Sequence, residues 1–328
     1  MGERLRYIDY TKGIAIILVV VGHLLPSATG LLKWIYSFHI PLFFIVSGMM
    51  LGIKDIRERK FFKTVIKLIR TLIVPYVFFN IFGTAILYLS GLKDFVQAGL
   101  NQDIFLFLIG AGGHSTWFLT SLFVAQICFL IVTKIKNEYL RHIISVIIVA
   151  VGFILSNKIV LFISVTRGMI GYSFLYIGYL FSRVMSAKNW DIRKWKIPAG
   201  LGLLFINIVS TLLNSRVDMH QFVFGNIALY YIGNLAGTLF ILFLCAKIEN
   251  IRIKPLNYIG ENSIIVQCTH GLLQSTVYAV FALGSGVAAQ LINTVVVLLL
   301  ELPLIYIITN YLGFIIGRKS LWRIKKAD

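Results

Sequence analysis

Long apolar stretches recur along this sequence, each close to the roughly 20 residues that a helix needs to cross a lipid bilayer. The ten stretches cover residues 13–31, 35–52, 72–90, 116–133, 142–157, 168–186, 197–214, 222–246, 262–283 and 287–313. Hydrophobic residues make up 58% of the 328-residue chain and charged residues 13%, a balance that excludes an ordinary soluble domain. The sequence therefore predicts an all-α integral membrane protein with about ten transmembrane helices, organised as a single domain over residues 1–328.

The basic residues are distributed unevenly between the loops that join these stretches. If the chain crosses the membrane ten times, 26 of the 31 Lys and Arg residues fall on the side that holds both termini, and five fall on the other. Because positively charged loops stay in the cytoplasm, this distribution predicts cytoplasmic termini. Topology and attraction to anionic lipid headgroups then explain the formal charge of +18, so we expect the lipid bilayer, and no nucleic acid, as a partner.

Ionisable residues occur in and beside the first two stretches. They are Asp9, Lys12, His23 and His39. Such side chains are costly within a spanning helix and usually face a cavity, a partner or a substrate. Lys12 and His23 are 11 residues apart, so they lie on one face of one helix and about 16 Å apart along its axis. Asp9 falls on the same face, one turn before Lys12. This spacing predicts a site, with a structural histidine as the alternative for His23 and an interfacial histidine as the alternative for His39.

A basic segment precedes the third stretch. Its cations are Lys60, Lys63, Lys67 and Arg70. They follow a helical spacing that forms one stripe, and aromatic and aliphatic residues occupy much of the remaining surface, so we predict an amphipathic helix at the cytoplasmic interface. For Lys60 and Lys63 we expect lipid headgroups as partners. Lys67 and Arg70 lie nearer the apolar stretch, where they can bind an anionic ligand through charge-assisted hydrogen bonds.

Further polar residues lie in or near the later stretches. The ninth stretch carries a polar stripe at intervals of three and four residues, formed by Ser263, Gln267, His270 and Gln274. Interhelical hydrogen bonding and the wall of a cavity both explain such a stripe. Other candidate binding residues are His114, Trp117, Arg167 and Glu301, and Trp117 equally suits an interfacial anchor. The three cysteines lie inside predicted helices without metal-ligand spacing, so we predict no metal site.

An ordered set of motifs occupies the first 48 residues. In order, they are D-x-x-K-G at residues 9–13, G-H at 22–23 and S-F-H-x-P-L-F-F-x-x-S-G at 37–48, followed by the basic segment. This order resembles the type-3 acyltransferase family, and most nearly its fucose 4-O-acetylase-like branch. Members of the family are bacterial multi-pass enzymes that move acyl groups, usually acetyl from acetyl-CoA, onto envelope glycans. Weaker matches at residues 117–119 and 259–270 extend the resemblance over essentially the whole chain.

The resemblance implies roles for the candidate residues. His23 matches the essential histidine of the family's R-x10-H motif, with Lys12 in place of the arginine and Asp9 beside it. Lysine keeps the charge of arginine but loses its bidentate geometry. Lys12, Lys67 and Arg70 would bind the phosphates of acetyl-CoA. The residues left for the acceptor side are His39, His114, Trp117, Arg167, Gln267, His270 and Glu301.

Together, the residues and the resemblance predict an enzyme of the bacterial cytoplasmic (inner) membrane. It would move an acetyl group from cytoplasmic acetyl-CoA to a hydroxyl of an envelope glycan or lipid-linked sugar. A neutral imidazole at position 23 can remove the proton from that hydroxyl or accept the acetyl group itself, and the sequence leaves both mechanisms open. The alternative function is a secondary transporter or flippase, in which buried ionisable residues relay protons or bind the substrate.

Overall fold

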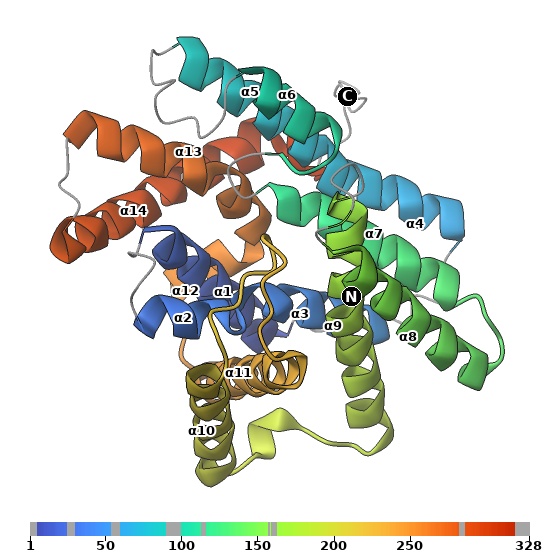
Figure 1. Cartoon of the computed structure of the whole chain (residues 1–328). Coiled ribbons are helices and arrows are strands. Elements are labelled where there is room, and N and C mark those ends of the chain that lie inside the picture. Colours follow the sequence, from blue (N-terminus) through green and yellow to red (C-terminus); the bar gives the residue numbers. More distant parts are fainter. Residues whose placement is uncertain are drawn as a thin grey trace, which may run out of the picture. The chain divides into compact units, whose positions relative to one another are not determined.

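The computed structural model describes residues 5–24, 30–53, 60–89, 100–112, 116–156, 158, 163–281 and 286–318. These residues form helices and loops without a named β-strand, and one isolated β-bridge joins Asp218 to Val223. The chain divides into two compact units, which we call unit 1 (residues 1–56 and 170–263) and unit 2 (residues 57–169 and 264–328). Figure 1 shows the helices of both units.

Unit 1 combines the start of the chain with its central part. Its elements are α1 (Arg6–Leu24), α2 (Gly30–Tyr36), α3 (His39–Ile53), the part of α9 (Ile163–Ala187) from residue 170, η5 (Ile192–Lys194), α10 (Ile197–Leu213), α11 (Ile227–Ile248) and α12 (Lys254–Glu261). Helix α1 packs against α3, α11 and α12, and α10 lies beside α11 (Figure 1). The sequence explains where α10 and α11 begin. Pro198 suits the first turn of α10, and the Asn226 side chain caps α11 by accepting from the Leu229 N–H at 3.1 Å.

Glycines let α3 and α9 approach closely within unit 1. A Cβ atom at Gly48 would lie 2.7 Å from the carbonyl carbon of Leu175. A Cβ atom at Gly178 would lie 2.8 Å from the carbonyl carbon of Ile45. Small residues at a helix crossing permit such backbone contact, a common way to pack helices in membranes.

Unit 2 holds the remaining helices. Its elements are α4 (Phe61–Leu68), η2 (Ile69–Ile73), α5 (Val74–Leu89), α6 (Leu100–Leu108), α7 (Trp117–Val132), α8 (Glu138–Leu155), the first turns of α9, α13 (Ser263–Phe281), α14 (Val287–Tyr311) and η6 (Gly313–Ile316). The 3₁₀ turn η6 packs against η2 and α5. Helices α2, α6 and α12 were not expected from the sequence.

The basic segment and the third apolar stretch form one continuous helical run, residues 61–89, rather than an interfacial helix followed by a separate span. The run contains a π-helical turn, η2, which ends two residues before Pro75. Proline has no N–H to donate to the carbonyl four residues earlier, and its ring clashes with that carbonyl. A wider π turn directly before the proline relieves the clash, so the helix continues without breaking.

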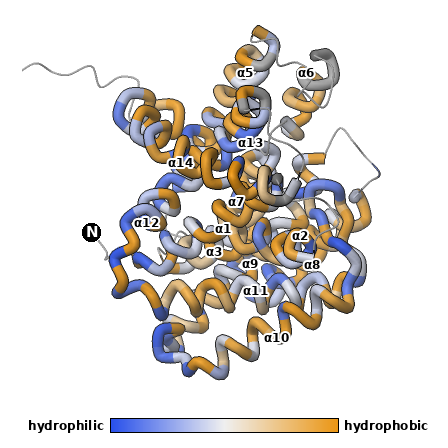
Figure 2. Tube along the Cα trace, turned by 90° about the vertical axis from the view of Figure 1, so that its left-hand side faces the viewer, coloured by the Kyte–Doolittle hydropathy of each residue, from blue (hydrophilic) through white to orange (hydrophobic). Residues whose placement is uncertain are grey.

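Each of the ten predicted stretches overlaps an α-helix of the structure. Five helical segments among the described residues are long and apolar enough to cross a membrane: Gly30–Ile53, Phe61–Ile86, Glu138–Leu155, Ile227–Ile248 and Ala288–Tyr311. Helices α7 and α10 are shorter and apolar. Figure 2 shows hydrophobic residues along most of α10, where Phe205 and Leu212 are 68% and 70% exposed. Contact with lipid explains outward-facing apolar side chains of this kind. The count of ten spans and the cytoplasmic termini stay predictions.

Candidate active site

The charged pair expected at the start of the first helix is present. In α1, the Lys12 Nζ atom lies 2.7 Å from Oδ1 of Asp9. The Asp9 side chain is 5% exposed and that of Lys12 is 27% exposed, so the carboxylate is buried while the ammonium group reaches the surface. A buried carboxylate needs a partner that compensates its charge, and the i, i+3 spacing supplies one from the same helix.

Helix α12 holds this charged turn of α1 in place. A Cβ atom at Gly260 would lie 2.7 Å from the carbonyl carbon of Asp9 and 3.0 Å from the backbone nitrogen of Gly13, so the two backbones touch. Next to this crossing, the Tyr10 hydroxyl donates a hydrogen bond of 2.6 Å to the carbonyl oxygen of Ile251. The position of the Asp9 side chain therefore depends on the packing of α12.

His23 and His39 come together at the other end of α1. His23 lies in the last turn of α1, and its side chain is exposed. Its place 11 residues after Lys12 puts the two residues about 16 Å apart along the helix axis. His39 is the first residue of α3 and is 6% exposed, and a Cβ atom at Gly22, the neighbour of His23, would lie 3.3 Å from the ring of Tyr36 that contacts His39. Two of the predicted site residues thus share one end of unit 1.

The His39 ring is buried in the protein and is not exposed to water at the membrane interface. Its Nδ1 atom lies 2.8 Å from the carbonyl oxygen of Ile35, and its ring centroid lies 4.9 Å from that of Tyr36. A carbonyl oxygen can only accept, so Nδ1 is the donor, and a neutral His39 carries its unprotonated nitrogen at Nε2. That nitrogen can accept a proton from a hydroxyl, which is what a general base must do.

The cations of the basic segment are exposed on unit 2. They are Lys60, Lys63, Lys67 and Arg70. Lys67 is the next-to-last residue of α4 and Arg70 the second residue of η2, so the π turn begins two residues after Lys67. The Thr71 hydroxyl donates to the Lys67 carbonyl at 2.9 Å, and the backbone around Arg70 packs against Gly317, whose built Cβ would lie 2.9 Å from the Arg70 carbonyl oxygen. The backbone is fixed here while the charged groups stay accessible.

Trp117 and Arg167 are brought together in unit 2. The Arg167 guanidinium carbon lies 5.1 Å from the centroid of the Trp117 ring. Arg167 is 3% exposed and Trp117 is 7% exposed, so this cation–π contact is shielded from solvent. The turn before α7 is tied to α5 as well, because the Asn80 side chain donates to the Thr116 hydroxyl at 2.8 Å. His114, which was predicted to lie beside Trp117, falls outside the described residues.

The buried polar groups of α13 and α14 meet through a residue that the sequence did not single out. Glu301 of α14 is fully buried, and the Thr269 hydroxyl lies 2.8 and 2.9 Å from its two carboxyl oxygens. Gln267 and His270 are also buried, at 4% and 0% exposure, and Nδ1 of His270 bonds the carbonyl oxygen of Val266 at 2.7 Å. Gln267 and His270 of the predicted stripe therefore face the interior of unit 2, and Thr269 makes an interhelical hydrogen bond to Glu301.

The cysteines lie in three different helices, Cys128 in α7, Cys245 in α11 and Cys268 in α13. All three are free thiols. Within the described part of the chain, no three His, Cys, Asp or Glu side chains gather in a way that could hold a metal ion.

One polar cavity and one polar stripe were missed at the sequence level. The cavity lies in unit 1 between α2, the end of α10 and the start of α11. The stripe runs along α11 at intervals of four residues, at Tyr230, Asn234 and Thr238. Each of these three side chains is at most 3% exposed and has a buried oxygen without a hydrogen-bond partner among the described residues. The spacing was visible in the sequence, but hydroxyl and amide groups in an apolar helix also serve ordinary helix packing.

Comparison with known proteins assigns the family. Residues 5–318 match an acyltransferase domain. The nodulation protein NolL of Mesorhizobium japonicum is 26% identical over 249 residues, which are 72% of this chain and 62% of that protein. The match thus spans less than two thirds of the relative's length. No solved structure is similar to this chain. Because the domain match covers nearly the whole sequence, the chain belongs to the type-3 acyltransferase family of membrane proteins.

Proposed function

We propose that this protein is a membrane O-acetyltransferase that moves an acetyl group from acetyl-CoA to a hydroxyl of an envelope glycan or lipid-linked sugar. Membership of the acyltransferase family supports the reaction class. The observation that carries the proposal is the arrangement of α1, which has a compensated charged pair at one end and an imidazole at the other. Acetyl-CoA has a charged head and a long thin arm that ends in the thioester. It can therefore extend along this helix from the charged pair to the imidazole.

The charged head of the donor would bind cationic side chains. Lys12, Lys67 and Arg70 are the proposed contacts for the phosphates of acetyl-CoA, because their charged groups are accessible on their units. Charge-assisted hydrogen bonds to phosphate are among the stronger polar contacts a protein can make. Asp9 would orient Lys12 through their ion pair.

The chemical step is assigned to His23. In the proposed mechanism its neutral imidazole removes the proton from the sugar hydroxyl, and the oxygen attacks the thioester carbonyl. The carbon–sulfur bond breaks, the acetyl group stays on the sugar oxygen, and the thiolate of CoA leaves and takes up a proton. The alternative order, in which His23 first carries the acetyl group, uses the same residues. His39, whose Nε2 can accept a proton, begins α3, which packs against α1, and is proposed to assist on the acceptor side.

The other proposed acceptor residues belong to unit 2. Polar and ionisable side chains within apolar helices often belong to a site, which supports a binding role for the buried ones. These are Trp117, Arg167, Gln267, His270 and Glu301, and His114 is proposed from the sequence alone. We propose that the enzyme resides in the bacterial cytoplasmic membrane, where acetyl-CoA is available on one face and the glycan on the other.

The test is consumption of acetyl-CoA by the purified protein. We expect labelled acetyl groups to move to a membrane fraction of the source cell that contains envelope glycans, and free CoA thiol to appear in equal amount. Protein that leaves acetyl-CoA intact in the presence of this fraction would contradict the proposal. Movement of a glycan across vesicles without acyl transfer would favour the transporter.

A further inference from the structure

Tyr36, the last residue of α2, lies where three parts of unit 1 meet. Its ring centroid is 4.9 Å from that of His39, the first residue of α3. A Cβ atom added to Gly22, next to His23 in α1, would lie 3.3 Å from Cε2 of the same ring. The Arg216 guanidinium carbon is 5.2 Å from the ring centroid. One aromatic ring therefore lies against the two helix ends that carry the proposed histidines and against an arginine from a distant segment.

The direction of the His39 imidazole depends on two contacts. Its Nδ1 atom donates to the Ile35 carbonyl oxygen at 2.8 Å, which holds one atom of the ring. A histidine ring has a broad range of rotation about its bond to Cβ, so this hydrogen bond alone restricts the ring only in part. The Tyr36 ring, inclined to the imidazole by 57°, limits the remaining rotation. The direction of Nε2 of His39 therefore depends on where Tyr36 lies.

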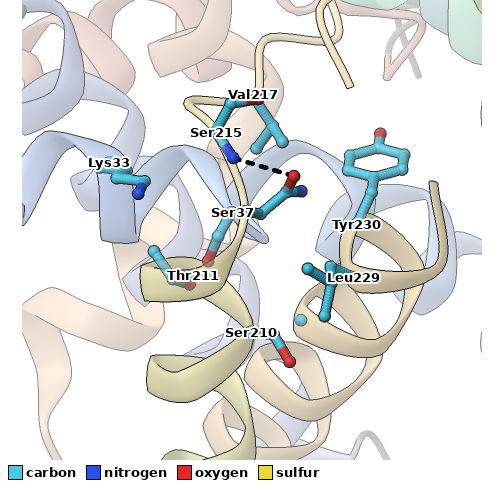
Figure 3. A pocket seen from close by; sticks show the side chains of 10 residues that line it. Lys33, Ser37, Ser210, Thr211, Ser215, Val217, Leu229 and Tyr230 are labelled. Carbon is cyan, nitrogen blue, oxygen red and sulfur yellow. Dashed lines mark hydrogen bonds between the residues drawn. The ribbon is translucent and has the colours of Figure 1, made fainter. Parts of the chain in front are cut away.

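The loop that carries Arg216 joins α10 to α11 and is held in place on both sides of the arginine. At its start, the Asn214 side chain accepts a hydrogen bond of 2.9 Å from the Ser215 N–H, drawn as the dashed line in Figure 3. Further along, the backbones of Asp218 and Val223 exchange hydrogen bonds of 2.7 and 2.9 Å. The Arg216 side chain therefore extends from a fixed backbone.

The Arg216 guanidinium has only a loose contact with a carboxylate. Its Nη2 atom lies 3.4 Å from Oδ2 of Asp218, whereas a close charge-assisted hydrogen bond measures about 2.7–2.9 Å. Its Nε atom is buried and has no hydrogen-bond partner among the described residues. An aromatic ring attracts a guanidinium, and the Tyr36 ring is within the range of a cation–π contact. The same contact restrains the Tyr36 ring from the side of the loop.

We propose that Tyr36 and Arg216 are positioning residues of the acyl transfer. Arg216 holds the Tyr36 ring against His39, and the ring directs Nε2 of His39 toward the acceptor hydroxyl. This inference rests on the proposed function, in which His39 assists on the acceptor side. The phosphates of the donor are assigned to cations elsewhere, so loss of either residue should lower the rate of transfer and leave the binding of acetyl-CoA unchanged.

The first test measures acetyl transfer by the purified protein to the membrane fraction that contains envelope glycans. Tyr36→Leu removes the ring and should lower kcat by about 10- to 100-fold, because a small misplacement of a reacting group is that costly. Tyr36→Phe keeps the ring and should stay within about 2-fold of wild type. Arg216→Met should lower kcat by about 2- to 5-fold, the equivalent of one partly exposed cation–π contact, and Arg216→Lys should recover most of it. The KM for acetyl-CoA should stay at the wild-type value in all four variants.

A second readout does not depend on turnover. The imidazole NMR signals of His39, assigned by their loss in His39→Ala, report the surroundings of the ring. We expect them to shift in Arg216→Met, because the Tyr36 ring moves. The matched control is Arg193→Met, at an arginine of unit 1 that also pairs with an aspartate two residues away, at 2.9 Å from Asp191. This control should leave kcat and the His39 signals at wild type, whatever its effect on the thermal midpoint.

Wild-type kcat in Tyr36→Leu, or His39 signals that do not move in Arg216→Met, would overturn the inference. An equal fall of kcat in Arg216→Met and Arg193→Met would also overturn it, because the loss would then follow stability and not the position of His39. Acetyl-CoA consumption by the wild type, measured in parallel, separates the two proposals. Consumption together with wild-type kcat in Tyr36→Leu removes the positioning role alone, whereas a lack of consumption in the wild type removes the proposed function.

Discussion

The crossing of α1 and α12 gives a quantitative prediction. In Gly260→Ala, the new Cβ atom would overlap the Asp9 carbonyl group, at 2.7 Å from its carbon, and would lie 3.0 Å from the backbone nitrogen of Gly13. Carbon atoms pack best at about 3.5–4.0 Å, so the two helices must move apart by about 1 Å. Because the obstacles are backbone atoms, no side-chain rotation can relieve the clash. Overpacking of this kind costs about 1–3 kcal/mol of the free energy of unfolding.

The same displacement should lower activity. Helix α1 carries His23, and a shift of about 1 Å in a catalytic group can cost on the order of 10²-fold in rate. Thermal unfolding in detergent and the rate of acetyl transfer measure the two effects. The control is Gly202→Ala in α10, where a Cβ atom meets no other atom within 4 Å. That variant should be neutral or up to about 1 kcal/mol more stable, since alanine favours helix more than glycine. Gly260→Ala with wild-type stability and activity would refute the close crossing.

Three further predictions concern charge. Lys67→Ala and Arg70→Ala should each weaken acetyl-CoA binding by about 10- to 100-fold, measured by calorimetry, while Lys60→Ala should change it little; equal small effects would mean that the stripe binds only lipid. Lys12→Arg should keep activity and stability. Lys12→Ala should lose up to about 3 kcal/mol in thermal unfolding because the buried Asp9 carboxylate loses its ion pair with Lys12, and unchanged stability would contradict that ion pair. Reporter fusions at Lys60 and Lys194 should both be cytoplasmic, and reporters on opposite sides would contradict the ten-span topology.

The positions of the helices could be predicted from the sequence because apolar length is a local property. All ten predicted stretches overlap helices. The ion pair of Asp9 and Lys12 could also be predicted, since an i, i+3 spacing places two side chains side by side whatever surrounds the helix. These features depend on neighbouring residues alone.

Features that depend on packing between distant segments could not be predicted. Where α1 crosses α12, the backbones of Gly13 and Gly260 are in contact, and nothing in the sequence around one glycine identifies the other glycine. Glu301 was among the candidate residues, but its partner Thr269 lies beside the predicted stripe and not in it. The Tyr230 hydroxyl resembles any buried tyrosine until its surroundings are known.

The π turn is an intermediate case. The basic stripe and the following apolar stretch were both identified, but they were expected as an interfacial helix and a separate span. Proline usually ends or kinks a helix, and the widened turn at residues 69–73 that lets it continue has no clear signature in the sequence. As a consequence, Lys67 and Arg70 belong to the same helical run as a candidate span.

The central claim is that His23 performs the chemistry of acyl transfer, and the rate of acetyl transfer by His23→Ala tests it most directly. A general base acts in the transition state, so its loss should lower the rate by about 10²–10⁴-fold. Binding of acetyl-CoA and the thermal midpoint should stay close to wild type, since the His23 side chain is exposed on its unit. The control His142→Ala, at a histidine of α8 that is 43% exposed, should transfer acetyl groups at the wild-type rate. A His23→Ala protein that also transfers acetyl groups at nearly the wild-type rate would contradict the account.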